Sequence, residues 1–434
     1  MENRVKKTAV TLYFLAAAFL MYYFITQDLN VGLFVTYRHV FALIIAGSAV
    51  ISFLYKPNIA RGVTAAKSAL VYSVPMFVTI VVSLFIWFAK QVDVSVISRG
   101  LSSSIVYMNM LSFALAAGAF LYIFGEKGIW YNLIAILASN LVMILTIILQ
   151  NGIGTFISEL ITLIVTFAGN TGEVIVQAEI HELAFCLGAY LIYMILKPQK
   201  NAVFFVLFIL TGFCFVAAFK RIGIIAIAIS LFFGVLLKLA ARLSEKKTMR
   251  ILTFLSVLLI FLLTAYIAAI KLGAFEYLEK AGVDTNGRSV IYSAVDKFYE
   301  FSPDFLGNGI GFLTFQLNSS MHIGVAAVHN DFLQYFIDLG FFGYLIWLIS
   351  MTVLRVRYFG SHGRTDNAIT AFCLMLYLIV VSLTDNTMNY PLLTLVLAIL
   401  MMGQDFDEKV KDTEIKMFGY ASEQNKIQNG GRLL

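Results

Sequence analysis

The chain has 434 residues, of which 60% are hydrophobic and only 13% are charged. An ordinary soluble domain is about 45–50% apolar and about 25% charged, so the composition excludes that class of protein. The net charge of +6 does not indicate a nucleic-acid partner, because lysines and arginines gather between long apolar runs, as they do in cytoplasmic loops of membrane proteins.

A helix needs roughly 20 mostly apolar residues to cross a membrane, and about twelve stretches of the chain come near this length. These stretches are 8–26, 33–55, 68–89, 104–124, 129–149, 183–197, 201–219, 222–241, 251–270, 331–354, 367–384 and 389–403. They predict an all-α, polytopic helical bundle over residues 1–403. The polar segment 404–434 is predicted to be a flexible cytoplasmic tail.

The distribution of basic residues predicts the topology. With the N-terminus in the cytoplasm, most of the 31 lysines and arginines fall in cytoplasmic segments, which requires an even number of spans and a cytoplasmic C-terminus. A full span at 153–168 would invert every later loop, so this shorter apolar stretch is predicted to be a non-spanning element on the outer side. The longest outer loop, 271–330, lies between spans 9 and 10, and loops of this length are usually functional.

Polar residues at three places on the predicted outer side are candidates for chemistry. Lys220 and Arg221 interrupt the apolar run 201–241 and predict a hairpin at the membrane boundary. Arg288 follows a turn signal in the long outer loop, and His329 lies just before a predicted span. Taken singly, these residues also fit a helix end that contacts lipid phosphate, a solvated loop arginine and a headgroup-facing histidine.

Taken together, these residues indicate a more specific chemistry. Arginine binds phosphate through two parallel hydrogen bonds and keeps its charge. Histidine can accept a proton from a hydroxyl group. Arg221, Arg288 and His329 on one side of the membrane therefore suit a substrate with a lipid tail, a pyrophosphate and a sugar, in which the pyrophosphate is the leaving group.

Three segments resemble the superfamily of O-antigen ligases and polymerases. HNDFLQYFIDLGFFGYLIWL, which begins at His329, is similar to the family's His-Asn helix. Arg288 with the following SVIYSAVDKFYEFSPDFLGNGIGFLTF is similar to its arginine, aromatic-rich helix and glycine turn. FKRIGIIAIAI resembles its serine-arginine-glycine hairpin, with Arg221 as the arginine and Lys220 in place of the serine. The resemblance extends over about 205–345.

The resemblance implies a C-type membrane glycosyltransferase on the outer face of a bacterial plasma membrane. It implies an inverting enzyme that takes undecaprenyl-pyrophosphate-linked glycans as donors and needs no metal or other cofactor. Arg221 and Arg288 would hold the pyrophosphate, His329 would assist the acceptor hydroxyl, and Lys220, Asn330 and Tyr292 would contact substrate. The expected partners are these glycans, membrane lipids, a chain-length regulator and a flippase, with no nucleic acid.

Several alternatives stay open at this point. A polymerase of repeat units for capsule, exopolysaccharide or O-antigen is favoured over a ligase that transfers the glycan to lipid A core, because polymerases are the commoner role. A transporter or flippase is disfavoured, because the predicted spans contain few charges. Asp405 and Asp407 match a metal-binding DxD pattern, but on the opposite side. The polar loop from Asp385 to Tyr390 is interpreted as a solvated turn rather than a sugar contact.

Overall fold

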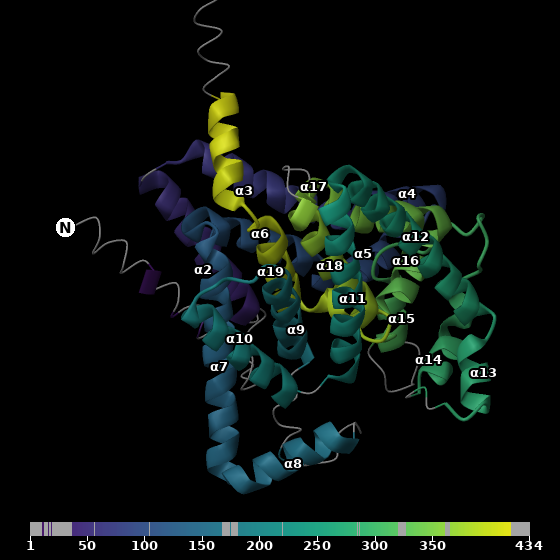
Figure 1. Ribbon diagram of the computed structural model, residues 1–434. Coiled ribbons are helices and arrows are strands. Elements are labelled where there is room, and N and C mark those ends of the chain that lie inside the picture. Colours follow the sequence, from purple (N-terminus) through teal and green to yellow (C-terminus); the bar gives the residue numbers. More distant parts are fainter. Residues whose placement is uncertain are drawn as a thin grey trace, which may run out of the picture.

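The structure is a computed structural model of the chain. It describes residues 11, 12, 16, 19, 37–55, 57–103, 105–166, 174, 181–218, 220–283, 285, 287–319, 327–360 and 365–417. The described residues form helices and connecting loops, with no β-strand among them, which confirms the predicted all-α class (Figure 1). Most of the predicted first span, 8–26, lies outside these residues.

The helices follow one another along the chain with short connections. They are α2 (Tyr37–Tyr55), α3 (Ile59–Tyr72), α4 (Val74–Ala89), α5 (Val94–Ser103), α6 (Ile105–Phe124), α7 (Lys127–Asn151), α8 (Ile153–Thr166), α9 (His181–Leu196), α10 (Ala202–Ala217), α11 (Arg221–Leu243), α12 (Glu245–Lys271), α13 (Ala274–Lys280), α14 (Arg288–Val295), η2 (Asp296–Phe298), α15 (Phe312–Ser319), α16 (Asp331–Ile349), η3 (Ser350–Leu354), α17 (Arg355–Gly360), α18 (Thr365–Ser382), η4 (Thr387–Asn389) and α19 (Pro391–Met402). The long outer loop of the prediction thus contains α13, α14, η2 and α15.

Five helices of the described chain are long and apolar enough to cross a membrane, and a bent pair of helices raises the number to six. The five are α7, α11, α12, α18 and the continuous helical stretch Asp331–Gly360. Shorter apolar helices occupy other predicted spans, namely α2, α6, α9, α10 and α19, while α8 occupies the stretch predicted not to span. The chain is therefore an integral membrane protein with several apolar helices.

The bent pair is α3 and α4, and it corrects the predicted continuous span 68–89. The two helices meet at Ser73 with a bend of 51°. Pro75 lies in the first turn of α4, where it has no N–H to donate to the preceding turn. Nε of Arg355, a buried residue of α17, donates a hydrogen bond to the Tyr72 carbonyl at 3.0 Å. Arg355 therefore satisfies a backbone group at the bend that has no helical partner.

Helix α16 is interrupted at Gly340, which the sequence prediction of a continuous span did not include. Gly340 has φ 72° and ψ −178°, a conformation that only glycine adopts readily. The loop 305–311 repairs the interruption, because Gly309 N donates to the Asp338 carbonyl at 2.7 Å and Phe341 N donates to the Phe305 carbonyl at 2.9 Å. The glycine turn recognised in the sequence is thus fixed directly to α16.

We expect Gly340→Ala to destabilise the protein strongly. A Cβ at this position would lie 2.2 Å from the Leu306 carbonyl carbon, and the positive φ alone costs about 1–3 kcal/mol for a residue with a side chain. Gly212→Ala is the matched control, because Gly212 lies in α10 with no atom within 4 Å of its Cβ direction. Thermal unfolding in detergent should show a lower Tm for Gly340→Ala alone, and equal Tm values would contradict the role of the interruption.

The centre of the bundle is formed by α9, α18 and α19. Almost every residue of α18 and α19 is buried. The Tyr377 hydroxyl of α18 donates to the Phe185 carbonyl of α9 at 3.0 Å. Because the polar segment 383–390 connects these two central helices, it lies inside the protein at the end of the bundle where α18 finishes.

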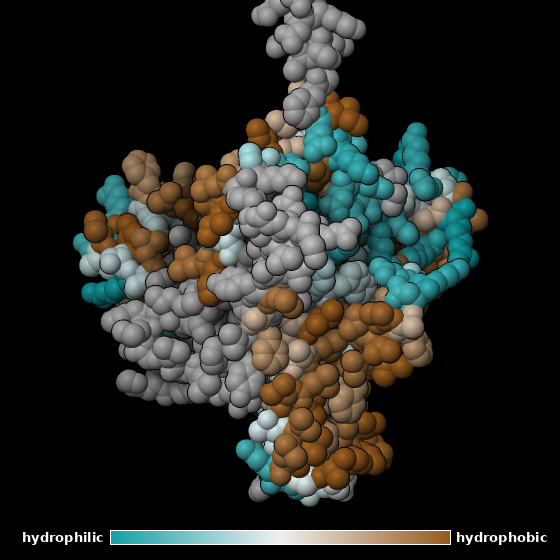
Figure 2. Space-filling model, turned by 90° about the vertical axis from the view of Figure 1, so that its left-hand side faces the viewer, coloured by the Kyte–Doolittle hydropathy of each residue, from teal (hydrophilic) through white to brown (hydrophobic). Residues whose placement is uncertain are grey.

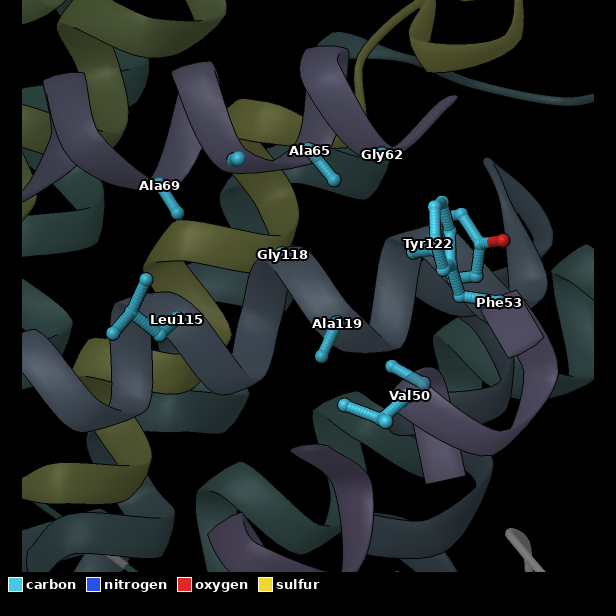
Figure 3. Close-up of a pocket in the computed structure, with 11 residues that line it drawn as sticks. Val50, Phe53, Gly62, Ala65, Ala69, Leu115, Gly118, Ala119 and Tyr122 are labelled. Atoms are coloured by element: carbon cyan, nitrogen blue, oxygen red, sulfur yellow. The ribbon is translucent and has the colours of Figure 1, made fainter. Parts of the chain in front are cut away.

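An apolar groove lies on the flank of the bundle between α2, α3 and α6 (Figure 3). Its volume is about 280 Å³. Small residues allow the close approach of α3 and α6, since a Cβ at Gly118 would lie 3.1 Å from the Ala65 carbonyl oxygen. One end of the groove reaches Tyr122, whose hydroxyl accepts a hydrogen bond from Asn58 N at 3.4 Å, so this end lies near the start of α3 (Figure 3).

Residues 406–417 form a helix, so the first part of the predicted flexible tail is ordered. Phe406 is fully buried, Asp407 forms an ion pair with Arg61 of α3 at 3.3 Å, and Thr413 Oγ1 lies 3.0 Å from Thr64 Oγ1. Asp405 Oδ2 accepts a hydrogen bond from Asn367 at 2.7 Å. Both acids of the DxD pattern therefore contact other side chains, and the described part of the chain contains no group of three or more potential metal ligands.

Lys409 of this C-terminal helix gives a testable pH dependence. Its side chain is 4% exposed and its amino group has no hydrogen-bond partner among the described residues. Burial lowers the pKa of Lys409 from 10.5 to about 8, although the carboxylates of Asp405 and Glu126 oppose the change. The unfolded chain then binds more protons than the folded protein between these values, so stability should rise as pH increases from about 8.

Lys409→Met should therefore raise the free energy of unfolding below pH 8 by roughly 3 kcal/mol and remove most of the rise in stability above pH 8. Lys411→Met is the matched control, since Lys411 lies on the exposed face of the same helix. Thermal unfolding at several pH values between 7 and 10 measures both effects. The same pH dependence in the wild type and in Lys409→Met would show that the amino group does not titrate there.

Candidate active site

The segment 383–390 is a buried polar connection between α18 and α19, and the interpretation of this loop as a solvated turn was wrong. Asp385 and Asn386 are 9% and 6% exposed, and Thr387 is 1% exposed. Met388 N donates to Asp331 Oδ2 at 2.9 Å, which ties the segment to the first residue of α16. Polar groups with these partners form a fixed surface against which other residues can be positioned.

His329 lies at the N-terminal end of α16, facing this segment. Its backbone has φ 52°, a left-handed conformation that histidine tolerates better than most residues. The side chain is 47% exposed, and its Nδ1 lies 3.8 Å from Asp385 Oδ1. An exposed imidazole with one nitrogen directed toward a carboxylate leaves the other nitrogen for a ligand.

Asp385 is itself held in place by two donors. Asn386 N donates to its Oδ1 at 2.8 Å and the Tyr390 hydroxyl donates to the same atom at 3.1 Å. Asp385 is thereby oriented toward His329 with an immobile acceptor oxygen.

Asn330 fixes the backbone next to His329. Its Oδ1 accepts a hydrogen bond from Leu333 N at 3.1 Å, so it caps α16. Its Nδ2 donates to the hydroxyls of Tyr266 at 2.9 Å and Tyr292 at 3.1 Å. Asn330 and Tyr292 are 0% and 2% exposed, so their polar groups contact protein rather than solvent.

Arg288 reaches the same segment from α14. It is the first residue of this helix, after Gly287 with φ 74°. Its Nη2 donates to the Thr384 carbonyl at 2.8 Å, while its Nε is buried without a hydrogen-bond partner among the described residues. Because Thr384 precedes Asp385 in the chain, Arg288 and His329 converge on adjacent residues although they come from different helices.

Arg221 is placed by the register of α11 against α18. The helices are antiparallel, since Lys238 Nζ lies 4.0 Å from Asp366 Oδ1, and a Cβ at Gly234 would lie 3.1 Å from Cys373 Sγ. Continued to the first residue of α11, this register brings Arg221 to the level of the residues after Ser382. Arg221 is exposed, and no hydrogen bond joins it to Arg288 or His329 in the part of the chain described.

Lys220 lies directly before α11, in extended conformation, and is half-buried. The preceding helix α10 ends at Ala217, so the apolar run 201–241 is divided into two helices as predicted. Phe215 lies beside Gly223, where a Cβ would meet its ring at 3.4 Å. This contact joins the adjoining ends of the two helices next to Lys220 and Arg221, whereas α10 as a whole packs against α7 and α9.

Residues 203–348 match the O-antigen ligase family. The matched region runs from α10 to α16 and contains Arg221, Arg288 and His329. This match, over about a third of the chain, supports the O-antigen ligase and polymerase superfamily. Members of this family are membrane glycosyltransferase-like enzymes, and the match supports a function of the O-antigen ligase or polymerase type. No curated protein matches the sequence.

Some residues that support His329 lie after residue 348, outside the matched region, and the sequence did not predict that they are buried. Both Asp385 and Tyr390 follow residue 348. Asp385 lies beside His329, and Tyr390 donates a hydrogen bond to Asp385. Asp331, the first residue of α16, is 1% exposed and accepts a hydrogen bond from the Met388 N–H. The polar residues of segment 385–390, between two apolar stretches, were the sign in the sequence that could have indicated this part of the site.

Proposed function

We propose that the protein polymerises undecaprenyl-pyrophosphate-linked oligosaccharide repeat units for capsule, exopolysaccharide or O-antigen. It acts as a C-type glycosyltransferase with about twelve membrane-spanning helices. The twelve apolar stretches of the sequence support this number, and five described helices together with one bent pair are long enough to span. Both termini lie in the cytoplasm of a bacterium, and the site at the end of α18 faces outward. The excess of basic residues at the opposite end of the bundle supports this orientation.

One observation carries the proposal: Arg288 and His329 converge on the adjacent residues Thr384 and Asp385. This arrangement places a permanent cation and a proton acceptor beside the same segment, 383–390. A cation there binds the pyrophosphate of the donor, and the imidazole accepts the proton of an acceptor hydroxyl. These are the two functions required to transfer a sugar from a diphosphate to an alcohol.

The proposed reaction is a single displacement at the anomeric carbon of the donor. His329 removes the proton from the acceptor hydroxyl as its oxygen forms the new glycosidic bond. The bond from the anomeric carbon to the pyrophosphate oxygen breaks on the opposite face, and undecaprenyl pyrophosphate leaves with the electron pair. Arg288 and Arg221 stabilise the charge that develops on this leaving group, and attack opposite to it inverts the anomeric configuration.

For Asn330 and Tyr292 we propose a positioning role in place of direct contact with the sugar, which their buried contacts support. Asn330 caps α16 and bonds two tyrosine hydroxyls, so it holds the backbone conformation that presents His329. Burial also raises the pKa of Tyr292, which keeps this phenol protonated as a neutral partner. Lys220, half-buried beside Arg221, adds positive charge for the diphosphate.

The decisive experiment uses the purified protein with defined undecaprenyl-pyrophosphate oligosaccharides. A product ladder whose steps equal the repeat unit indicates a polymerase. A single transfer that occurs only when lipid A core is added indicates a ligase and replaces the proposed polymerase role. EDTA should leave the rate unchanged, whereas a loss of activity that Mg²⁺ or Mn²⁺ restores would contradict the proposed metal-independent mechanism.

A further inference from the structure

Helix α8 presents three different faces around its axis. Phe156 and Leu163, which are 1% and 3% exposed, attach it to the protein. Thr155, Ser158, Glu159, Thr162 and Thr166 follow one another on a polar arc. A third arc consists of exposed apolar residues. They are Ile153, Ile157, Ile161, Ile164 and Val165, with exposures of 61%, 47%, 55%, 48% and 77%. We call this arc the isoleucine stripe.

The length and direction of α8 do not suit a membrane span. Its 14 residues extend over about 21 Å, which is less than the roughly 30 Å of a hydrocarbon core. Helix α7 runs along the bundle, and α8 turns away from its end and runs across it (Figure 1). If α7 crosses the membrane, α8 therefore lies along the membrane plane. The two helices meet at Gly152, with φ 87°.

The isoleucine stripe continues an apolar surface of the spanning helix. Leu145 and Leu149 near the end of α7 are 56% and 77% exposed. Figure 2 shows that the lower projection of the molecule, where α7 and α8 lie in Figure 1, is coloured mainly as hydrophobic. An exposed apolar area of this kind requires an apolar partner. Since the flank of α7 contacts lipid in a membrane protein, the same lipid meets the stripe.

We propose that α8 is an interfacial anchor whose isoleucine stripe lies among the acyl chains of the bilayer, at the end of the bundle that carries the candidate site. The polar arc faces the headgroups and water, and Glu159 Oε2 on this arc accepts a hydrogen bond from Val174 N at 3.0 Å. Helix α8 contains no lysine or arginine, so it binds lipid through apolar burial rather than through headgroup charge. The anchor sets the depth of this end of the protein in the membrane.

Single spin labels in the full chain, reconstituted in phosphatidylglycerol and phosphatidylethanolamine vesicles, test this placement. The background is favourable, because Cys186, Cys214 and Cys373 are all buried and can be replaced by alanine. Labels at Ile161→Cys and Thr162→Cys compare neighbouring residues on the stripe and on the polar arc. Collision with dissolved oxygen reports contact with lipid, and collision with a water-soluble nickel chelate reports contact with water.

The label at Ile161 should lie about 5–10 Å below the headgroup level and collide mainly with oxygen, while the label at Thr162 should collide mainly with the nickel chelate. Ile157→Cys should repeat the result for Ile161 and guards against misfolding of one variant. Nickel collisions at both stripe positions would place the stripe in water and overturn the proposal. Protection of the stripe from both reagents would show that a second copy or another protein covers it and would overturn the proposal equally.

Discussion

Replacing Arg288 with alanine should lower kcat for glycan transfer by about 10²–10³-fold, the usual effect of removing one group that stabilises a developing anion. The Thr384 carbonyl holds Arg288 Nη2 at 2.8 Å, so the guanidinium is oriented before substrate binds. A carbonyl contact of this kind leaves the positive charge of the guanidinium available for the diphosphate. Arg288→Lys should recover only part of the rate, because an ammonium cannot form the paired hydrogen bonds.

Lys297→Ala is the matched control for Arg288. Lys297 lies in η2, directly after the helix α14 that begins with Arg288, and its amino group is 5.1 Å from the ring centre of Phe298. It is exposed and has no role in the proposed mechanism. Gel analysis of products from both variants, at equal amounts of folded protein, measures the difference. Normal product from Arg288→Ala would exclude this arginine from the reaction.

Replacing His329 with alanine should lower kcat by about 10²–10⁴-fold, as expected for the loss of a general base. Asp385→Asn should give a smaller loss in kcat with little change in KM, because Asp385 Oδ1 lies 3.8 Å from the imidazole and does not contact substrate in the proposed mechanism. The double variant should be hardly slower than His329→Ala, since the two residues act as one unit.

A control variant and the double variant together test whether His329 and Asp385 act as a pair. Asp304→Asn removes an exposed carboxylate from the segment 271–330 and should leave the rate unchanged. Multiplicative losses in the double variant would show that Asp385 acts separately from His329. Circular dichroism and the size-exclusion profile of each variant distinguish a lost catalytic group from a lost fold.

Much of the fold could be predicted because lipid imposes a simple pattern on sequence. Apolar stretches of fixed length located α7, α11, α12 and α18 to within a few residues. The bend at Ser73 and the interruption at Gly340 were missed, because hydropathy averages over a window and does not register single residues. Pro75 was a sign of the bend at Ser73 in the sequence. The interruption at Gly340 depends on contacts with a loop about 30 residues earlier in the chain, which local sequence does not indicate.

The sequence pointed to the charged residues of the candidate site. It did not indicate the buried residues that hold them in position. Arg221, Arg288 and His329 are conspicuous because ionic groups are costly near lipid. Asp385 was assigned to a solvated turn, because a short polar segment between two spans usually has that role. Its burial depends on how α18 and α19 pack against the rest of the bundle, and pairing of helices distant in sequence is not encoded in local pattern.

The interruption of α16 has a consequence for how the protein is made. The Asp338 carbonyl and the Phe341 N–H, on the two sides of the interruption, bond to loop 305–311. In hydrocarbon each unpaired backbone group costs several kcal/mol, so the nascent α16 cannot pass into lipid as an independent segment at low cost. The ribosome completes loop 305–311 before it reaches residue 331. We therefore expect the loop to dock as α16 leaves the translocation channel, which makes membrane insertion and the assembly of the site a single event.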